Sequence, residues 1–297
     1  MNGIDERKTE NLLDRIYGGL NMSWPIVILY AVGTAVLTSV FLILPVFQDT
    51  SFQRMGVYME AWIFFAVIIM ANCKKPLESA LKTFVFFLIS QPLIYLFQVP
   101  FTWQGWGIFH YYLYWFLWTL LTFPMAYIGW YITKKNWLSL LILAPVLGFL
   151  GYTAFDSGRQ CLQDFPYLLI TVLFCILQIL LYVMAFLSDN RQRIIGILIP
   201  VLTIVILAVL SPQVDLQVTD YLPDAPVFTE EPVVEVADES ICQVQIHSLE
   251  KGMVYVYAHK YGTTEVTIRE GNRVLRYSFK VYSDKGVSRI RITPIEP

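Results

Sequence analysis

The longest stretch without charged side chains sets the strongest limit on this fold. Residues 83–133 form 51 consecutive positions without Asp, Glu, Lys or Arg. The hydrocarbon core of a bilayer is about 30 Å thick and a helix crosses it in about 20 residues, so this stretch predicts two membrane-spanning helices joined by a turn. We place the turn at residues 100–107, where Trp103 and Trp106 are expected at the headgroup level.

Five further segments have the length and composition of a membrane span. They cover residues 26–47, 55–73, 136–155, 165–188 and 194–210. The second of these is the weakest, because Glu60 lies near its start, and we expect Glu60 at the membrane interface. The chain is therefore predicted to contain seven spans, in a transmembrane domain of residues 23–210. Only 15% of its residues are charged, against about 25% in soluble domains, which excludes a soluble globular enzyme and a disordered regulator.

The distribution of Lys and Arg predicts the orientation, because short loops rich in these residues stay in the cytoplasm. Alternate loops hold ten of them against two in the others. The ten are Arg7, Lys8, Arg15, Lys74, Lys75, Lys82, Lys134, Lys135, Arg191 and Arg193, and the two are Arg54 and Arg159. This pattern predicts an N-terminus inside and a C-terminus outside the cytoplasmic membrane.

Residues 1–22 form an amphipathic lead-in to the first span. One helical face is apolar and consists of Leu12, Leu13, Ile16, Tyr17 and Leu20. We expect this cytoplasmic segment to lie along the inner leaflet of the lipid bilayer.

The composition changes after the last predicted span. Residues 211–239 contain four prolines, eight acidic residues and no basic one, which predicts an extended tether. Their carboxylates lack the spacing of a calcium loop, so we expect no metal site there. Residues 240–297 alternate apolar and polar side chains between glycine-containing turns, which predicts six short strands in a small antiparallel sandwich.

One part of this β-rich region resembles a known family. The residues Ala258-His-Lys-Tyr-Gly262-Thr263-Thr264-Glu-Val266-Thr-Ile268, which follow Gly252-Met-Val254, are similar to the bacterial Ig-like (BIG-type) repeat. The resemblance covers about 65 of the 297 residues. It departs from the family pattern in the strand from Val254 to Ala258, which is longer than usual. The resemblance implies an all-β, Ig-like sandwich that acts at a bacterial surface in adhesion, spacing or envelope contacts.

The four cysteines do not form a metal or redox motif, because none falls in a C-x-x-C pair. The predicted topology places only Cys161 and Cys242 outside the membrane, where a disulfide is permitted. They are therefore a candidate disulfide, and the alternative is two separate thiols.

Neutral polar side chains form two stripes at helical spacing inside predicted spans. One stripe contains Gln91, Tyr95 and Gln98, and the other contains Thr171, Cys175, Gln178 and Tyr182. They could line a polar cleft for an uncharged or zwitterionic solute, or they could hydrogen-bond neighbouring helices. Pro92 follows Gln91 and is expected to free a backbone carbonyl there. We expect no Asp, Glu, Lys or Arg deep in any span, which leaves His110 as the titratable candidate for ligand binding.

These observations favour recognition over chemistry. No hydrolase, ATPase or dinucleotide motif is present, so we expect no catalysis and no cofactor. The net charge of −2 argues against nucleic acid as a partner. The favoured hypothesis is a bacterial membrane protein that displays an Ig-like domain outside the membrane. It would take part in envelope interaction or serve as an accessory subunit, with another membrane subunit or an envelope polymer as partner.

Two other functional hypotheses stay open. The first is a small-solute transporter or transport subunit that uses a neutral polar cleft between the third and sixth spans. Its ligand contacts would come from Gln91, Tyr95, Gln98, His110, Gln178 and Tyr182. The second is an intramembrane transferase built from Asp49, Glu60 and His110.

Overall fold

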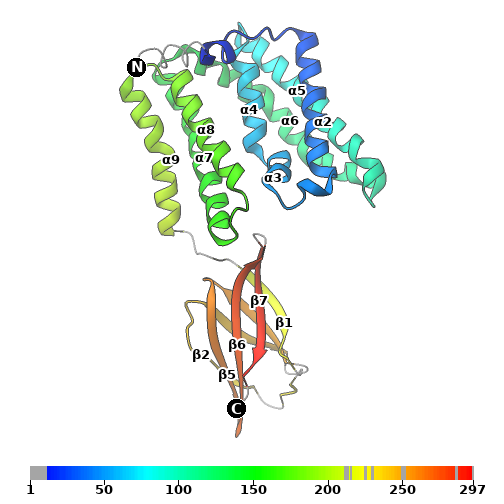
Figure 1. The fold of residues 1–297 in the computed structure, drawn as a ribbon, viewed down its shortest axis with the longest axis vertical. Helices are drawn as coiled ribbons and strands as arrows, with labels where there is room; N and C mark the ends of the chain where they lie inside the picture. Colours follow the sequence, from blue (N-terminus) through cyan, green and yellow to red (C-terminus); the bar gives the residue numbers. More distant parts are fainter. Residues whose placement is uncertain are drawn as a thin grey trace. The chain divides into compact units, whose positions relative to one another are not determined.

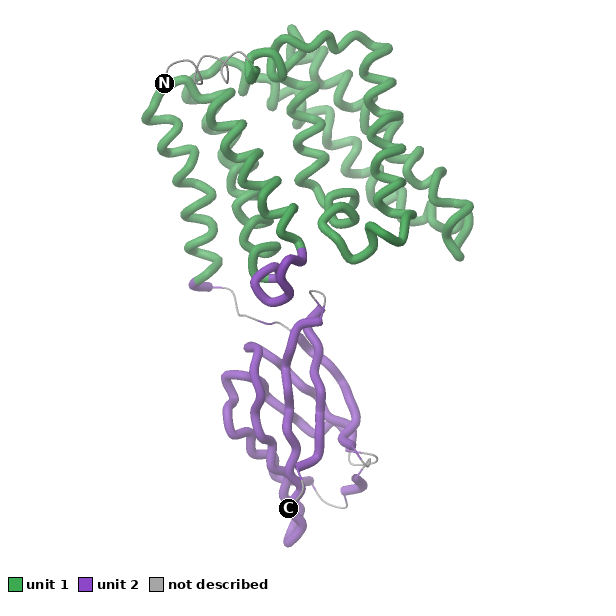
Figure 2. The backbone as a smooth tube through the Cα atoms, viewed as in Figure 1, with its two compact units in different colours: residues 1–159, 168–208 green, residues 160–167, 209–297 purple. Residues whose placement is uncertain are grey.

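The chain folds into two compact units (Figures 1 and 2). The computed structural model describes residues 12–210, 214, 216–223, 226–228, 231–248, 252–284 and 287–295. Unit 1 comprises Met1–Arg159 and Leu168–Ala208 and is helical, whereas unit 2 comprises Gln160–Tyr167 and Val209–Pro297 and is mainly β-structure. Residues 1–11 of the predicted lead-in lie outside the described residues.

Long helices build unit 1. They are α2 (Trp24–Ile43), α3 (Ser51–Val57), α4 (Met59–Ala71), α5 (Pro76–Gln98), α6 (Phe109–Gly129), α7 (Trp137–Gln163), α8 (Leu169–Phe186) and α9 (Asn190–Leu210). Short 3-10 segments adjoin them at Pro45–Phe47, Val99–Phe101, Gly105–Ile108 and Trp130–Lys134. Pro25 and Pro76 lie in the first turns of α2 and α5, where the missing N–H leaves no hydrogen bond unmade.

Among the described residues, five helices are long and apolar enough to cross a membrane by themselves: α2, α5 with the segment after it, α7, α8 and α9. Helices α3 and α4 are bent by 61° at a break and add a sixth span if they count as one. The sequence predicted seven spans. The difference lies in residues 55–73, which break at Tyr58, and in α6, whose many Tyr and Trp side chains make it less apolar.

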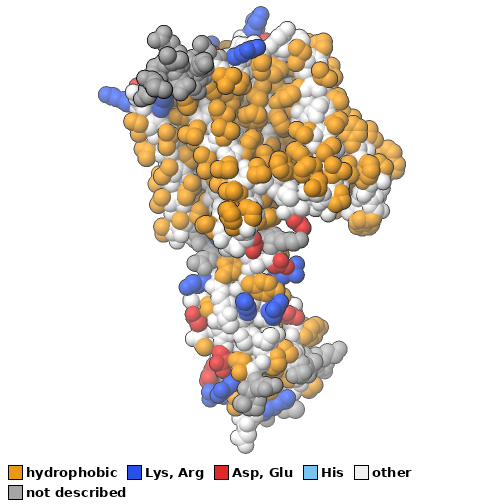
Figure 3. Space-filling view, viewed as in Figure 1, with side chains coloured by type: hydrophobic (Ala, Val, Ile, Leu, Met, Phe, Trp, Pro, Cys, Tyr) orange, Lys and Arg blue, Asp and Glu red, His pale blue; other side chains and the backbone are white. Residues whose placement is uncertain are grey.

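The surface of unit 1 fits a membrane environment. Hydrophobic side chains cover its visible face in Figure 3, and Lys and Arg side chains appear at the upper edge of the helices in that view. Many large apolar side chains are exposed, among them Leu29 at 71%, Leu141 at 69% and Leu113 at 64%. An apolar surface of this extent is costly in water and stable in lipid, so the helical unit belongs in a membrane.

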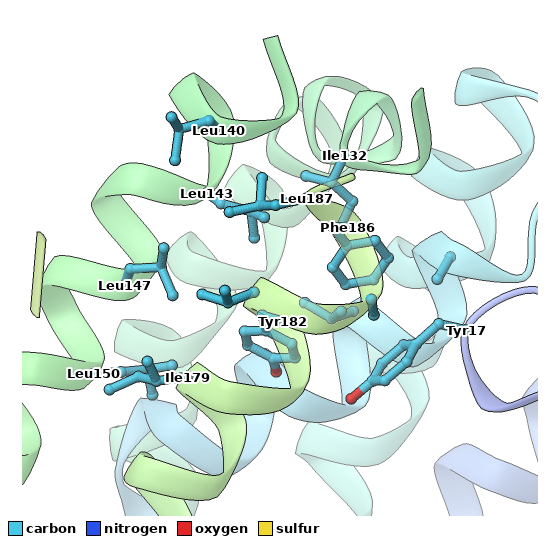
Figure 4. Packing of buried hydrophobic residues seen from close by; sticks show 14 of the residues in the cluster. Tyr17, Ile132, Leu140, Leu143, Leu147, Leu150, Ile179, Tyr182, Phe186 and Leu187 are labelled. Carbon is cyan, nitrogen blue, oxygen red and sulfur yellow. The ribbon is translucent and has the colours of Figure 1, made fainter. Parts of the chain in front are cut away.

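The lead-in contributes to the core of unit 1. Leu13 and Tyr17 are buried, and the Tyr17 ring lies edge-on to Phe186 and Tyr182 at 5.2 and 6.3 Å between centroids (Figure 4). Asn72 Nδ2 also donates a hydrogen bond to the Ile16 carbonyl at 2.7 Å. The predicted apolar face is therefore divided, because part of it packs against α8 and part stays exposed. The expectation that the whole face lies on the inner leaflet is wrong.

Close packing joins the last helix to the rest of unit 1. A Cβ atom built at Gly151 in α7 would lie 2.9 Å from Cα of Pro200 in α9. A side chain at this position would therefore separate the two helices, which explains the glycine.

Unit 2 contains two antiparallel sheets. The order of the first is β1 (Leu216–Tyr221), β4 (Met253–Ala258) and β3 (Cys242–Ser248). The order of the second is β2 (Val233–Val236), β5 (Gly262–Glu270), β6 (Arg273–Asp284) and β7 (Val287–Pro294). Both sheets supply one core, with Val254 and Val256 from the first and Ile268, Phe279 and Val281 from the second.

The predicted tether is in part strand structure, which corrects the boundary placed at residue 240. Leu216 in β1 pairs with Ala258, and Val234 in β2 pairs with Ile268, so both strands form sheet edges. Their alternating side chains, such as Val234 and Val236, pack against the core. This period of two prevails over the acidic and proline-rich composition, because paired strands bury apolar surface that a free tether would expose.

Candidate functional site

A cavity in unit 1 opens beside the first predicted polar stripe. Its volume is about 330 Å³, near the lower end of the range for small-molecule sites. Gln91, Tyr95 and Gln98 of α5 line it, as their spacing on one helical face allows. The structure thus brings together the three stripe residues that the sequence singled out on this helix.

Gln91 is the polar group in this cavity that most needs a partner. The residue is only 8% exposed, and its side-chain amide has no hydrogen-bond partner among the described residues. Its amide atoms are not among the fully buried polar atoms without a partner, so they are accessible from the cavity, where water or a ligand can hydrogen-bond them. Pro92 follows directly and cannot donate a backbone hydrogen bond, so the helix also leaves a carbonyl of the preceding turn without its usual partner.

The other two stripe residues are held in place by their own surroundings. Gln98 Nε2 donates to the Ile94 carbonyl one turn earlier at 3.1 Å, which leaves its side-chain oxygen for other partners. The ring of Tyr95 packs near Phe109 and Tyr112 of α6, at 6.0 and 6.1 Å between centroids. These contacts position polar groups at the cavity wall before any ligand arrives.

The cavity lining is polar but carries no charge. The polar side chains come from Gln91, Tyr95, Gln98, Thr102, Gln104 and Tyr111. Asp, Glu, Lys, Arg and His are absent from the described residues that line it. Such a set can donate and accept hydrogen bonds, but it offers no counter-charge, so it suits an uncharged polar group better than an ion.

The break between α3 and α4 supplies another wall. Gly56, Val57 and Trp62 line the cavity from this side, and Trp62 Nε1 donates to the Gly56 carbonyl at 3.3 Å across the bend. A broken helix leaves backbone groups that side chains or ligands must satisfy, which is why such breaks often border binding sites in membrane proteins.

The second predicted stripe lies elsewhere. Gln178 and Tyr182 of α8 are fully buried, and the Tyr182 hydroxyl donates to Gln178 Oε1 at 2.8 Å. Tyr182 belongs to the packed cluster shown in Figure 4. Neither Tyr182 nor Gln178 lines this cavity or the second one described below. Neither cavity is therefore lined by both stripes, as the predicted cleft between the third and sixth spans requires.

His110 is also apart from the cavity. It lies in the first turn of α6, is exposed, and has its ring 6.1 Å from that of Tyr111. Only Tyr111 of this pair lines the cavity.

Sequence reasoning missed a buried charged group between α3, α4, α7 and α8. Arg54 forms an ion pair with Asp156 at 2.8 Å, and Glu60 is fully buried. We call Arg54, Glu60, Asp156, Thr171 and Gln178 the α8 polar cluster. Arg54 and Glu60 are close enough to interact electrostatically with each other and with Cys175. Glu60 is therefore enclosed by protein side chains, whereas its place at the membrane interface and the absence of charge deep in the spans stay predictions.

Several atoms in and beside the α8 polar cluster lack partners within the described part of the chain. They are Arg54 Nε, both carboxylate oxygens of Glu60, Ser157 Oγ, Thr171 Oγ1 and Gln178 Nε2. A signal for the cluster was present in the sequence, because the predicted topology puts Arg54 and Asp156 in loops on the same side. The extension of α7 to Gln163, beyond the predicted end at residue 155, brings Asp156 into the bundle.

The remaining predicted features concern cysteines and metals. All four cysteines are free and buried, including Cys161 and Cys242 of the candidate disulfide. Over the described ranges, no three His, Cys, Asp or Glu side chains come together as a metal site.

Comparisons with known proteins identify no protein similar to this one. The chain matches no protein-family model, no curated protein and no solved structure. The functional argument therefore depends on the cavity, the clusters and the surfaces described above.

Proposed function

We propose that the chain is a seven-span protein of a bacterial cytoplasmic membrane that displays an Ig-like sandwich outside and acts in envelope interaction or as an accessory subunit. Five apolar helices and the bent α3–α4 pair support six of these spans. Helix α6 is taken as the seventh, because 21 residues reach about 31 Å, the thickness of the hydrocarbon core.

The observation that carries this proposal is a folded β unit with its own core directly after the last apolar helix. With basic loops inside and an odd number of spans, this unit would lie outside the membrane. The resemblance to bacterial Ig-like repeats falls on β4 and β5. The strand order departs from that of immunoglobulin domains, since β5, β6 and β7 are consecutive neighbours, so "Ig-like" here refers to the two-sheet architecture.

The orientation is testable at the turn between β5 and β6. Gly271 has a φ of +55°, and no atom lies within 4 Å of where its Cβ would stand, so an inserted epitope has room. We expect added protease to remove this epitope from intact cells and to spare it in inverted vesicles. A tag before Met1 should behave in the opposite way. Protection of the Gly271 epitope on intact cells would overturn the proposal.

The exposed face of β6 and β7 suggests which envelope partner to test. Lys280 pairs directly with Arg291 across the two strands. Arg276 and Arg289 are exposed on the same face, where they already form ion pairs with Glu265 and Asp284. Like charges directly opposite each other destabilise a sheet, so an anionic partner would relieve a cost that folding alone does not. This arrangement supports an anionic envelope polymer as the ligand.

Binding of full-length protein to a polyanionic matrix tests this partner. We expect retention on polyglutamate beads that falls with salt, and none on neutral dextran beads. Lys280→Glu with Arg291→Glu should abolish retention. The control Lys260→Glu changes an exposed lysine outside these two strands and should keep most of it. Retention that survives the double substitution would contradict an anionic partner at this face.

A second candidate function is ligand binding or transport by the helical unit, and the unpartnered amide of Gln91 at the cavity wall favours it. The contacts reduce to Gln91, Tyr95 and Gln98, because the α8 stripe lies outside the cavity. In vesicles, Gln91→Leu is expected to stop solute flux while Gln178→Leu leaves it intact. Equal flux in both variants would exclude this cavity as the route.

A further inference from the structure

A second cavity continues from the first. It has a volume of about 430 Å³ and runs between α4, α5, α6 and α7. Nearly all of its lining is apolar or aromatic. Of its few polar members, Thr119 and Thr122 donate their hydroxyls to carbonyls of their own helix, at 3.1 and 2.6 Å, so these hydroxyls are already satisfied. The buried hydroxyl of Thr83 has no partner within the described part of the chain.

Three residues line both cavities: Trp62, Gln91 and Trp115. The polar cavity and the apolar cavity therefore adjoin each other at these three side chains, and the unpaired amide of Gln91 lies at the boundary. One molecule with a polar end and an apolar end could occupy both. A purely polar solute would leave the apolar part empty, and a simple hydrocarbon would leave Gln91 unpaired.

The apolar cavity has the length of a lipid chain. Its lining on α6 runs from Trp115 to Gly129, which corresponds to about 21 Å at 1.5 Å per residue. This exceeds half the thickness of the hydrocarbon core, about 15 Å. The cavity therefore fits an extended acyl chain.

The polar cavity selects the kind of head. Its lining carries no charged side chain, so an anionic or cationic head would lose its hydration without gaining a counter-charge. Three glutamine amides can each donate and accept hydrogen bonds, as can the hydroxyls of Tyr95, Thr102 and Tyr111. Groups of this kind complement hydroxyls, which also donate and accept.

We propose that the two joined cavities bind one amphiphile with an uncharged, hydroxyl-rich head and a single extended hydrocarbon chain. The head hydrogen-bonds Gln91 and Gln98, and the chain lies between α4, α6 and α7. This inference rests on the second candidate function, the use of the polar cavity as a ligand site, and it names the ligand class of that site.

Native mass spectrometry of the full chain in detergent tests the proposal with two probes that share one acyl chain. We expect glucosyl monoacylglycerol to bind at least about tenfold more tightly than lysophosphatidylglycerol. Gln91→Leu should weaken the glucosyl lipid by about tenfold, since it removes the amide at the junction. The control Gln178→Leu should not. Equal affinity for the two lipids, or tighter binding of the phosphate-bearing one, would overturn the uncharged head.

The position of the ligand's hydrocarbon chain in the apolar cavity is tested separately. Thr122→Trp places a ring in the apolar cavity and should weaken glucosyl lipid binding, whereas Leu121→Trp, at the neighbouring residue that lies outside the lining and is 49% exposed, should not. If Thr122→Trp fails to fold, unmodified protein gives the answer, because the affinity for alkyl glucosides should rise as the chain lengthens from C8 to C16.

Different results would contradict the amphiphile and the use of the polar cavity as a ligand site. Binding that depends on Gln91 but ignores both chain length and Thr122→Trp would overturn the amphiphile and leave the polar cavity as a ligand site. Binding that ignores Gln91→Leu would overturn both.

Discussion

Two polar stripes on mainly apolar helices lie in different environments in unit 1. The α5 stripe, Gln91, Tyr95 and Gln98, faces a cavity and includes an amide without a partner. The α8 stripe is fully buried at Gln178 and Tyr182, which hydrogen-bond each other. Residue types and spacing are nearly the same, so the neighbouring elements must decide the outcome.

The neighbours explain the contrast. Beside α5 the chain breaks between α3 and α4, and the bend leaves space next to Trp62. Beside α8 the lead-in and α7 fill the space, and Arg54, Glu60 and Asp156 meet at one end of the stripe. We therefore assign recognition to the α5 stripe and structural stability to the α8 stripe.

The largest expected effect is the loss of the cation in the α8 polar cluster. Arg54→Met would leave Asp156 without its 2.8 Å partner beside the buried Glu60. Removing one member of a fully buried ion pair costs about 3–5 kcal/mol. Because the Asp156 side chain is 38% exposed and keeps another interaction, we expect a loss of about 2–3 kcal/mol here. Denaturant unfolding in detergent measures the change.

The matched control is Arg191→Met, at an exposed arginine, which should change the free energy of unfolding by no more than about 0.5 kcal/mol. If Arg54→Met were as stable as this control, the cluster would have no structural role, and the assignment of the two stripes would fail.

The next effect concerns the hydrogen bond within the α8 stripe. Tyr182→Phe removes the hydroxyl that donates to Gln178 at 2.8 Å and leaves both polar ends of a buried amide without partners. The expected loss is about 1–2 kcal/mol, again by denaturant unfolding. If the variant were as stable as the unmodified protein, water would already hydrogen-bond the amide of Gln178, and the α8 stripe would be as accessible to water as the α5 stripe.

Much of the fold was predictable because long apolar runs and period-two alternation are local signals. They placed helices near α2, α5, α7, α8 and α9 and strands β3 to β7. The prediction of six strands in residues 240–297 was wrong by one, because the described residues there form five. The failures arose where long-range contacts compete with local composition. Residues 55–73 break because α3 and α4 pack in different directions, and β1 and β2 form because sheet edges were available to pair with them.

The candidate site was predictable only in part. Helical spacing predicted that Gln91, Tyr95 and Gln98 share a face, and they do line one cavity. Nothing local distinguishes them from Gln178 and Tyr182, because the difference lies in which helices pack beside each stripe. The burial of Glu60 within the protein was not predicted for the same reason, since its electrostatic neighbours Arg54 and Cys175 come from other elements of the fold.

Cysteine labelling compares the accessibility of the two stripes directly. Gln98→Cys, at the cavity wall, should react with a small methanethiosulfonate at least about tenfold faster than Gln178→Cys, which must wait for local opening. The background should be low, because all four native cysteines are buried and burial raises the pKa of the Cys242 thiol to about 11. Similar rates at both positions would show that the α8 stripe is also accessible.

The smallest expected change in the free energy of unfolding is that of Tyr95→Phe, because Tyr95 is the tyrosine of the α5 stripe as Tyr182 is of the α8 stripe. The Tyr95 hydroxyl has no hydrogen-bond partner among the described residues, and its ring packing against Phe109 and Tyr112 would persist in Tyr95→Phe. Without ligand, the free energy of unfolding should therefore change by less than about 0.5 kcal/mol, well below the loss for Tyr182→Phe. A loss as large as that of Tyr182→Phe would mean that the Tyr95 hydroxyl has a structural partner in the folded protein, and the α5 stripe would then stabilise the bundle just as the α8 stripe does.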